Sequence, residues 1–211
     1  MPKPSLSQIL APYEADPEGY SRLWRQATSE EALRLFLPFF PLPPCRGVDI
    51  GAGDGRDATF LAHRGYTMTA VEPSAALRRF AQQRPDANSA VTWVDDALPD
   101  LWNVRRSVPE ARFRFALLSS VLMHVPEDDH DSAMVALSAI LEPCGRVFLS
   151  LRQQTDPARL MFPTTVATLT PKIQRAGLRI VHAVENLPSS WRGGSVGVPT
   201  WDFLVLEKGA L

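Results

Sequence analysis

A glycine-rich turn between an apolar run and a helical pattern is the feature of this sequence best suited to bind a ligand. The stretch VDIGAGDGRDATFLA has glycine at three alternate positions, Gly51, Gly53 and Gly55, with Asp49 two residues ahead. Glycines spaced in this way permit a tight turn and remove the β-carbons that would keep a ligand off the main chain. Dinucleotide-binding folds use G-x-G-x-x-G instead, and Arg56 occupies the place of their third glycine here. The turn therefore predicts close contact with a flat or extended ligand.

Carboxylates follow the next two apolar runs. The run TMTAVEP brings Glu72 to a strand end 21 residues after Gly51, and VTWVDDALPDL carries Asp95 and Asp96. Open α/β sheets bind ligands outside the carboxyl ends of their strands, so we expect these side chains beside the glycine turn. A carboxylate at Glu72 can accept hydrogen bonds from both hydroxyls of a ribose. The alternatives are a solvated acid for Glu72 and a helix cap or exposed position for Asp95.

A further motif, FRFALLSSVLMHVPEDD, joins an apolar strand to an acidic helix start. It places Ser119, Ser120 and His124 in the connecting loop. A histidine can act as a general base because its pKa lies near neutral pH. The alternative for His124 is that it shapes the pocket or hydrogen-bonds a backbone group. Serine hydroxyls at a strand end also often satisfy local backbone groups.

Together these motifs, from residue 48 to about residue 152, resemble the class I S-adenosylmethionine (SAM)-dependent methyltransferases, and most closely those that act on small molecules. The resemblance implies SAM as the cofactor, S-adenosylhomocysteine (SAH) as its product and His124 as the candidate catalytic residue. It also implies that Asp96 accepts the adenine amino group and that the next backbone N–H meets a ring nitrogen. The family often has an aspartate where Ala116 stands, so the resemblance implies no hydrogen bond there. The residues expected to bind the cofactor are Asp49, Gly51, Ala52, Gly53, Arg56, Glu72, Pro73, Asp95, Asp96, Ala97, Ser119 and Ser120.

Arg56 and Asp57 open the helix that follows the glycine turn. The helix macrodipole disfavours a cation at a helix start, so we expect a carboxylate partner for Arg56. That partner is either Asp57 or another acid, such as the carboxylate of the methionine moiety of the cofactor. An exposed surface pair is the alternative.

Aromatic residues outside these motifs are the candidates for contacts with a methyl acceptor. Tyr13, Tyr20 and Trp24 precede the sheet, in the part that family members commonly fold over the active site as a lid. An aromatic stripe at helical spacing equally suits a core. Trp191 and Arg192 lie in the long loop ENLPSSWRGGSVGVPT, and a long loop inside a compact domain is often functional.

Short apolar runs alternate with helical patterns from Val48 onwards, which predicts βαβ units in a parallel sheet. Strands are expected at 47–50, 67–71, 91–94, 113–119 and 146–151. Helices are expected near 56–64, 74–83, 98–106 and 128–141. Gly65, Gly145 and Gly177 each follow a helical pattern, where a left-handed C-terminal cap needs glycine.

The two ends of the chain complete the expected fold. Residues 18–40 have helical spacing, and the prolines of 38–44 predict a stiff, extended connector after it. A helix over 164–176 precedes strands at 178–184 and 201–207, and the glycine-bearing loop between these strands predicts antiparallel pairing. The expected fold class is α/β: a doubly wound, mostly parallel seven-stranded sheet with an antiparallel C-terminal strand pair, helices on both faces and an N-terminal helical lid.

Composition limits the classes of function. A chain of 211 residues, 45% of them hydrophobic, suits a single domain over 1–211, with a helical extension over 1–44 and a cofactor-binding core over 45–211. The 22 Lys and Arg nearly balance the 23 Asp and Glu, so there is no overall field to attract nucleic acid or an anionic membrane.

Cys45 and Cys144 form neither a CxxC pair nor a Cys/His cluster, which argues against a zinc site and a disulfide framework. The sequence has no apolar stretch suited to a signal peptide or membrane helix, so a cytoplasmic location is expected.

Four functions compete on this sequence. The first is methylation of a small molecule by in-line displacement, which requires alignment more than catalytic side chains. The second keeps SAM but uses RNA or protein as the acceptor, against which stand the near-neutral charge and Ser-Ser-Val-Leu in place of an Asn-Pro-Pro-Tyr motif. The third is a non-catalytic SAM-binding regulatory module, and the fourth is a nicotinamide-dependent oxidoreductase.

Overall fold

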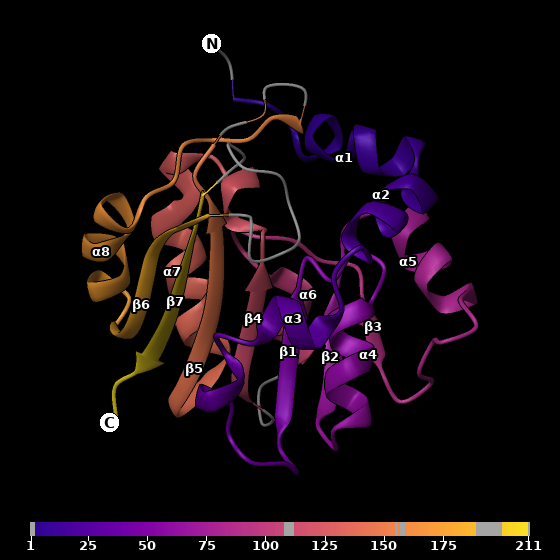
Figure 1. The fold of residues 1–211 in the computed structure, drawn as a ribbon. Coiled ribbons are helices and arrows are strands. Elements are labelled where there is room, and N and C mark those ends of the chain that lie inside the picture. Colours follow the sequence, from indigo (N-terminus) through magenta and orange to yellow (C-terminus); the bar gives the residue numbers. More distant parts are fainter. Residues whose placement is uncertain (1–2, 108–111, 155, 157–158, 189–199, 211) are drawn as a thin grey trace.

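A seven-stranded sheet forms the centre of the molecule (Figure 1). The computed structural model describes residues 3–107, 112–154, 156, 159–188 and 200–210, and within these ranges no helix combines the length and apolar character needed to cross a membrane. The strands are β1 (Arg46–Ile50), β2 (Thr67–Val71), β3 (Thr92–Val94), β4 (Phe113–Ser119), β5 (Leu141–Arg152), β6 (Leu178–Pro188) and β7 (Thr200–Lys208). The helices are α1 (Leu6–Ala15), α2 (Pro17–Trp24), α3 (Ser29–Leu33), α4 (Arg56–His63), α5 (Ala75–Gln83), α6 (Trp102–Ser107), α7 (His130–Ile140) and α8 (Val166–Arg175), with short 3-10 helices η1 (Leu37–Phe39), η2 (Leu122–His124) and η3 (Glu127–Asp129).

The strands lie in the order β3-β2-β1-β4-β5-β7-β6. The five strands β3, β2, β1, β4 and β5 are parallel to one another. β7 lies between β5 and β6 and runs antiparallel to both. Because β1 pairs with β2 on one side and with β4 on the other, the strand order reverses between β1 and β4. Open α/β sheets bind ligands at such a switch point. The fold class predicted from the sequence is confirmed, including the antiparallel C-terminal pair.

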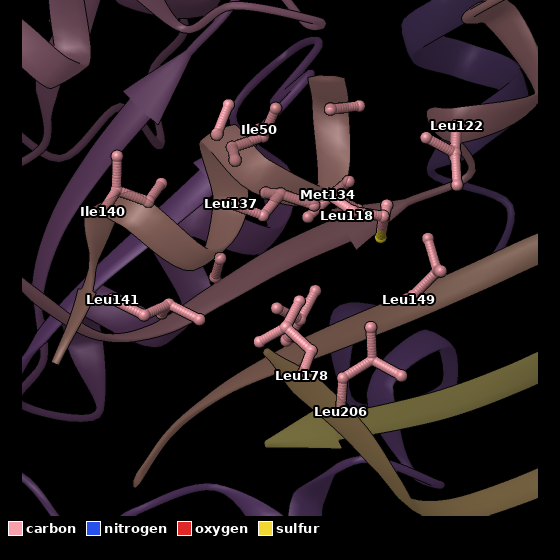
Figure 2. Close-up of a cluster of buried hydrophobic side chains, with 14 of the residues drawn as sticks. Ile50, Leu118, Leu122, Met134, Leu137, Ile140, Leu141, Leu149, Leu178 and Leu206 are labelled. Atoms are coloured by element: carbon pink, nitrogen blue, oxygen red, sulfur yellow. The ribbon is translucent and has the colours of Figure 1, made fainter. Parts of the chain in front are cut away.

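Alternate side chains of the strands supply two buried apolar clusters, one on each face of the sheet. On β4, Ala116 and Leu118 belong to one cluster, whereas Phe115 and Leu117 belong to the other. Residues from α7 pack against the strands in the first cluster (Figure 2), and residues from α6 and α8 complete it. Residues from α3 and α4 complete the second. Both faces are therefore covered, as a parallel sheet requires.

Phe148 of β5 is fully buried within the second cluster. Its ring centroid lies 4.1 Å from that of Phe40, in a stacked arrangement, and 5.5 Å from that of Phe36. These contacts hold the segment between α3 and β1 against the sheet. The prediction of an extended connector over 38–44 is wrong at its start, because Pro38 fits the first turn of η1 and lets the chain coil there.

Several element boundaries differ from those predicted, and β6 ends at Pro188 rather than at 184. α6 begins at Trp102 rather than near residue 98, because Leu101 has a φ of 47°, a left-handed conformation that does not continue a right-handed helix. β5 begins at Leu141, directly after α7, and is longer than predicted because its pairing with β4 continues across an irregularity.

Two of the three glycines predicted as helix caps end a helix, and the third lies inside a strand. Gly65 and Gly177 have φ values of 91° and 72° just beyond α4 and α8, which confirms both as left-handed caps. The same prediction for Gly145 is wrong, because that residue lies inside β5. A β-carbon at Gly145 would come within 2.9 Å of the carbonyl oxygen of Glu142, so close backbone approach requires glycine there.

Helix α1 has no counterpart among the predicted elements. Ser5 caps it, with a reciprocal capping box to Gln8. Ser-x-x-Gln is a recognised N-terminal signal, but Pro12 interrupts the helical pattern that follows it. The helices predicted within 18–40 correspond to α2 and α3.

We predict that Phe148→Ala lowers the free energy of unfolding by about 3–5 kcal/mol, because it removes a ring from a closely packed cluster on the central part of the sheet. Chemical denaturation followed by circular dichroism measures this. Val135→Ala on α7 is the control, since Val135 is 52% exposed and its truncation should change stability by about 0.5 kcal/mol or less. Equal losses in the two variants would contradict the packing described here.

Candidate active site

A cavity of about 490 Å³ lies at the carboxyl ends of β1, β2, β4 and β5. Helices α1 and α2 lie at this edge of the sheet (Figure 1). Their residues Tyr13 and Trp24 form part of the cavity wall. Small-molecule sites in proteins typically enclose about 300–1,000 Å³. Every residue predicted to bind the cofactor lines this cavity except Asp95, and so does His124.

The glycine turn brings bare backbone to the cavity wall. Gly51 and Gly53 have φ values of 69° and 58°, which favour glycine. The N–H groups of Gly51 and Ala52 both donate to the carbonyl of Val71, at 2.7 and 3.0 Å, and so tie the turn to the end of β2. A β-carbon at Gly53 would lie 2.8 Å from the ring of Trp24, which shows how closely α2 approaches the turn.

Glu72 points into the cavity from the end of β2, as predicted. It is only 5% exposed, and its two carboxylate oxygens accept hydrogen bonds from the N–H groups of Gly53 and Ser74, each at 2.8 Å. Burial raises the pKa of Glu72 to about 7, although the two backbone hydrogen bonds and the nearby Arg78 act to lower it. Each oxygen keeps a second acceptor position for a ligand hydroxyl.

The two adjacent aspartates after β3 have different positions. Asp96 lines the cavity, and its oxygens accept the N–H groups of Ala97 at 2.9 Å and Val104 at 2.8 Å. The carboxylate of Asp95 instead pairs with Arg78 at 2.6 Å, and its side chain is 68% exposed. Asp95 does not line the cavity, so its contact with the cofactor stays a prediction that this geometry does not support.

Ser119 and Ser120 bring the end of β4 to the cavity. Ser120 has a φ of 66°, and its N–H donates to the hydroxyl of Ser150 on β5 at 3.0 Å. The sharp turn after β4 therefore exposes main chain as well as hydroxyl groups to a ligand.

A hydrogen-bonded group of three side chains, His124, Tyr13 and Arg159, lines another part of the cavity. The Tyr13 hydroxyl lies 3.1 Å from Nε2 of His124 and accepts hydrogen bonds from Nη2 of Arg159 at 3.0 Å and from Nε at 3.3 Å. Because Arg159 can only donate, the hydroxyl proton is directed to Nε2 of a neutral His124 ring.

The pKa of His124 is about 4, chiefly because the ring is buried and secondly because Arg159 carries a positive charge nearby. The ring is therefore neutral at physiological pH. A neutral ring can accept a proton, but this one is a weak base and Tyr13 already occupies its acceptor nitrogen. In this geometry His124 accepts the hydrogen bond of the Tyr13 hydroxyl and so orients it.

Arg56 has the carboxylate partner that the sequence predicts. Its Nε and Nη2 donate to the two oxygens of Asp57 at 2.7 and 2.9 Å, and Nη1 donates to the carbonyls of Trp24 and Ala27. Most of its donors are thus engaged in joining the end of α2 to the start of α4.

Asp49 lies beside this pair and is almost completely buried. Burial together with the charge of Asp57 raises the pKa of Asp49 well above its usual range.

Sequence reasoning missed Asp54, which lies inside the glycine turn. Its carboxylate is buried and accepts hydrogen bonds from the Ser21 hydroxyl at 2.6 Å and from the Arg25 guanidinium. Both donors belong to the segment of α2 and the residue after it, so Asp54 fastens the helical cover to the turn. An acid between two glycines of a ligand-binding turn was the available signal.

Only some of the residues predicted to contact a methyl acceptor lie at the cavity. Tyr13 and Trp24 line the cavity. Tyr20 does not belong to its lining, and instead packs with its ring centroid 4.6 Å from that of Tyr13 and 5.7 Å from that of Trp24. Trp191 and Arg192 lie outside the described residues. Where the chain is described, it does not gather three His, Cys, Asp or Glu side chains that could hold a metal ion.

The model of a protein family described as a methyltransferase domain matches residues 21–183. That span contains the glycine turn, Glu72, Asp96 and the loop of His124. The chain belongs to this methyltransferase family. No match was found among curated protein sequences.

Solved structures show that the methyltransferase shares its fold with several enzymes. The 1,6-didemethyltoxoflavin-N1-methyltransferase of Burkholderia thailandensis, with bound 1,6-didemethyltoxoflavin and SAH, is 20% identical, with 99% of this chain and 92% of that chain covered and a TM-score of 0.71. A TehB-like SAM-dependent methyltransferase from Corynebacterium glutamicum is 20% identical over 92% of this chain and 98% of that one, with a TM-score of 0.68. The [4+2]-cyclase SpnF is 14% identical over 80% and 76% of the two chains, with a TM-score of 0.59, so the fold alone does not fix the reaction.

We predict that Asp54→Ala loosens the cover of the methyltransferase cavity. The variant should lose about 2 kcal/mol of stability, because Ser21 and Arg25 lose a buried charged acceptor. Hydrogen exchange of the α2 amides should accelerate relative to that of the sheet. Glu18→Ala is the control. Glu18 lies on α2 itself, and its replacement removes an exposed ion pair with Arg22 but no contact with the turn. Unchanged exchange in α2 of Asp54→Ala would contradict this role.

We also predict that His124 of the methyltransferase stays neutral down to about pH 5 and titrates near pH 4. Its ring-proton NMR signals, assigned by their loss in His124→Gln, measure this. Arg159→Gln should raise the pKa, since it removes one cause of the depression. Because the unfolded chain binds this proton near about pH 6.5, the native state should also lose stability as the pH falls from there to about 4. A midpoint near 6.5 in the folded protein would contradict the burial of the ring.

Proposed function

We propose that the methyltransferase transfers a methyl group from SAM to a small-molecule acceptor by in-line displacement, with SAH as the product. The observation that carries this proposal is the buried carboxylate of Glu72, held by the N–H groups of Gly53 and Ser74 beside a turn in which Gly51 and Gly53 have no side chains. This arrangement suits the two hydroxyls of a ribose. The structurally similar enzyme from Burkholderia thailandensis was crystallised with SAH, which supports the same cofactor here.

The cavity wall fits the other parts of this cofactor. Asp96 and Ala97 lie where an adenine base would bind, and both belong to the cavity lining. Ser119 and Ser120 lie on the opposite side of the glycine turn, across β1, and would meet the amino-acid end. A β-carbon at Gly51 would lie 2.6 Å from Val121, so the wall has room only for glycine at this position.

When bound, SAM supplies a methyl group that its sulfonium already activates. The protein must therefore chiefly align the acceptor and exclude water. Helices α1 and α2 provide the cover, and Tyr13 and His124 present fixed hydrogen-bonding groups on the acceptor side. We propose that His124 receives a proton from the acceptor through the Tyr13 hydroxyl, which passes its own proton to Nε2 of His124 and takes up that of the acceptor. Its low pKa restricts this role to acceptors that release a proton readily.

The dimensions of the site favour a small acceptor. The cavity measures about 490 Å³ for cofactor and acceptor together, and α1 and α2 lie over it. An RNA strand or a folded protein needs an open approach, and the near-neutral charge of the chain gives RNA no electrostatic attraction. We therefore favour a metabolite-sized acceptor over a macromolecule.

Calorimetric titration with SAH, SAM and NAD tests the cofactor, and conversion of SAM to SAH across a panel of small metabolites tests catalysis. We expect SAH and SAM to bind, NAD to bind far more weakly, and turnover to depend on one acceptor of the panel. Binding of NAD without SAH would overturn the proposal in favour of an oxidoreductase. Turnover on RNA or protein and not on the metabolite panel would overturn the small-molecule acceptor.

We predict that Glu72→Gln weakens SAH binding by about tenfold to a hundredfold, because it removes a charged acceptor from a buried site. In the wild type, affinity should rise with pH up to about 7 and then level off. The reason is that ribose hydroxyls favour the carboxylate over the acid, so binding below the pKa of Glu72 must release its proton. Glu72→Gln should abolish this pH dependence, whereas the exposed control Glu18→Gln should retain it. If Glu72→Gln bound SAH with the same affinity and the same pH dependence as the wild type, Glu72 would not hold the ribose.

A further inference from the structure

Two arginines, Arg152 and Arg159, line the cavity. Arg152 ends β5, and β1 and β4 separate β5 from β2, whose end carries Glu72. At about 4.8 Å between neighbouring strands, the ends of β2 and β5 lie roughly 14 Å apart. Arg159 follows β5 and reaches the Tyr13 hydroxyl beneath α1. Arg152 therefore lies on the β5 side of the cavity, away from the proposed nucleoside, and the charge of Arg159 is close enough to act on it.

The hydrogen-bonding capacity of these arginines is largely unused. Nε of Arg152 is buried and has no hydrogen-bond partner among the described residues. Its Nη1 contacts the sulfur of Met161 at 3.8 Å, and a thioether is a weak acceptor. Arg159 directs two of its five donors to the single neutral oxygen of Tyr13. A guanidinium is best satisfied by a paired oxyanion, and within the part of the chain that the structure describes no carboxylate forms a salt bridge with either arginine.

Charge in this region favours an anionic ligand. The pKa of Arg152 is lowered first by burial and then by the positive charge of Arg159, so the two cations destabilise each other. The carboxylate of Asp156 offsets part of this repulsion, and His124 remains neutral beside it. Among the described residues, Asp156 is the acid that acts on Arg152 and Arg159 is the second cation, so the pair carries a positive surplus that a bound anion would neutralise.

We infer that the methyl acceptor carries an oxyanion, a carboxylate or a phosphate, that binds between Arg152 and Arg159. This inference rests on the proposed function, because it assigns the cofactor to the other half of the cavity. Trp201, Met123 and Met161 line the cavity beside the arginines and offer apolar surface to the rest of the acceptor. The acceptor class is accordingly a small organic acid or phosphate ester with an apolar, preferably aromatic, body.

Three matched probes test this inference on the full chain saturated with SAH: benzoate, phenyl phosphate and the neutral benzamide. Calorimetry should show that benzoate or phenyl phosphate binds at least tenfold more tightly than benzamide. The tighter of the two anions identifies the group as carboxylate or phosphate. Equal binding of benzamide and both anions, or no binding of the anions, would overturn the inference.

Variants connect the binding to the arginines. Arg152→Gln and Arg159→Gln should each weaken the preferred anion by about tenfold or more, since each removes a charged donor. Arg152→Lys keeps the charge but loses the paired donors, so it should fall between Arg152→Gln and the wild type. Arg175→Gln, which removes an exposed arginine at the end of α8 paired with Asp131 of α7 and outside the cavity lining, is the control and should bind like the wild type. Anion binding that is unchanged in both glutamine variants would overturn the inference.

A further comparison separates this inference from failure of the proposed function. Absence of SAH binding in the wild type would refute the proposed function before any anion is added. SAH and 5′-methylthioadenosine should each bind Arg152→Gln and Arg159→Gln as they bind the wild type. If the variants lost SAH binding but kept 5′-methylthioadenosine, which lacks the amino-acid carboxylate, the arginines would serve the cofactor and the inference would be wrong.

Discussion

The buried carboxylate of Glu72 sets the geometry of the whole site. A carboxylate at this depth costs free energy unless N–H groups solvate it, and Gly53 and Ser74 provide two of them. For the Gly53 N–H to point at Glu72, the chain after β1 must turn through left-handed conformations at Gly51 and Gly53. The parallel register that sets Ile50 opposite Val71 brings the two strand ends level, so that the turn and the acid meet.

The same turn also holds the cover of the cavity. Its outer side presents Asp54 to Ser21 and Arg25, while Arg56, the first residue of α4, donates to carbonyls at the end of α2 and beyond. The ring of Trp24 then lies against Gly53. A single stretch of chain thus faces the proposed cofactor on one side and the helical cover on the other. Stability of the cover and shape of the ligand site are consequently determined by the same residues.

Features that depend on local pattern were predictable from the sequence. Buried parallel strands appear as short apolar runs, so β1 to β4 were placed within one residue, and Glu72 and Asp96 were located because they directly follow such runs. The local pattern alone did not separate Asp95 from Asp96, because both follow the same apolar run; the family resemblance was what assigned the adenine contact to Asp96. Arg159 and its partner Tyr13 are 146 residues apart in sequence, and Arg25 and Asp54 are 29 apart. No local pattern carries such pairings, which arise only when the sheet and its cover are assembled.

The antiparallel direction of β7 determines which part of that strand borders the cavity. A parallel strand contributes its carboxyl end to this edge of the sheet, but β7 contributes its beginning, and Trp201 therefore lies in register with Arg152 in the wall. The glycine turn and Glu72 belong to β1 and β2 on the other half of the sheet. Evolution can therefore alter the recognition surface near β5 and β7 while the strands that carry the turn and the acid stay unchanged, which gives one scaffold access to chemically different acceptors.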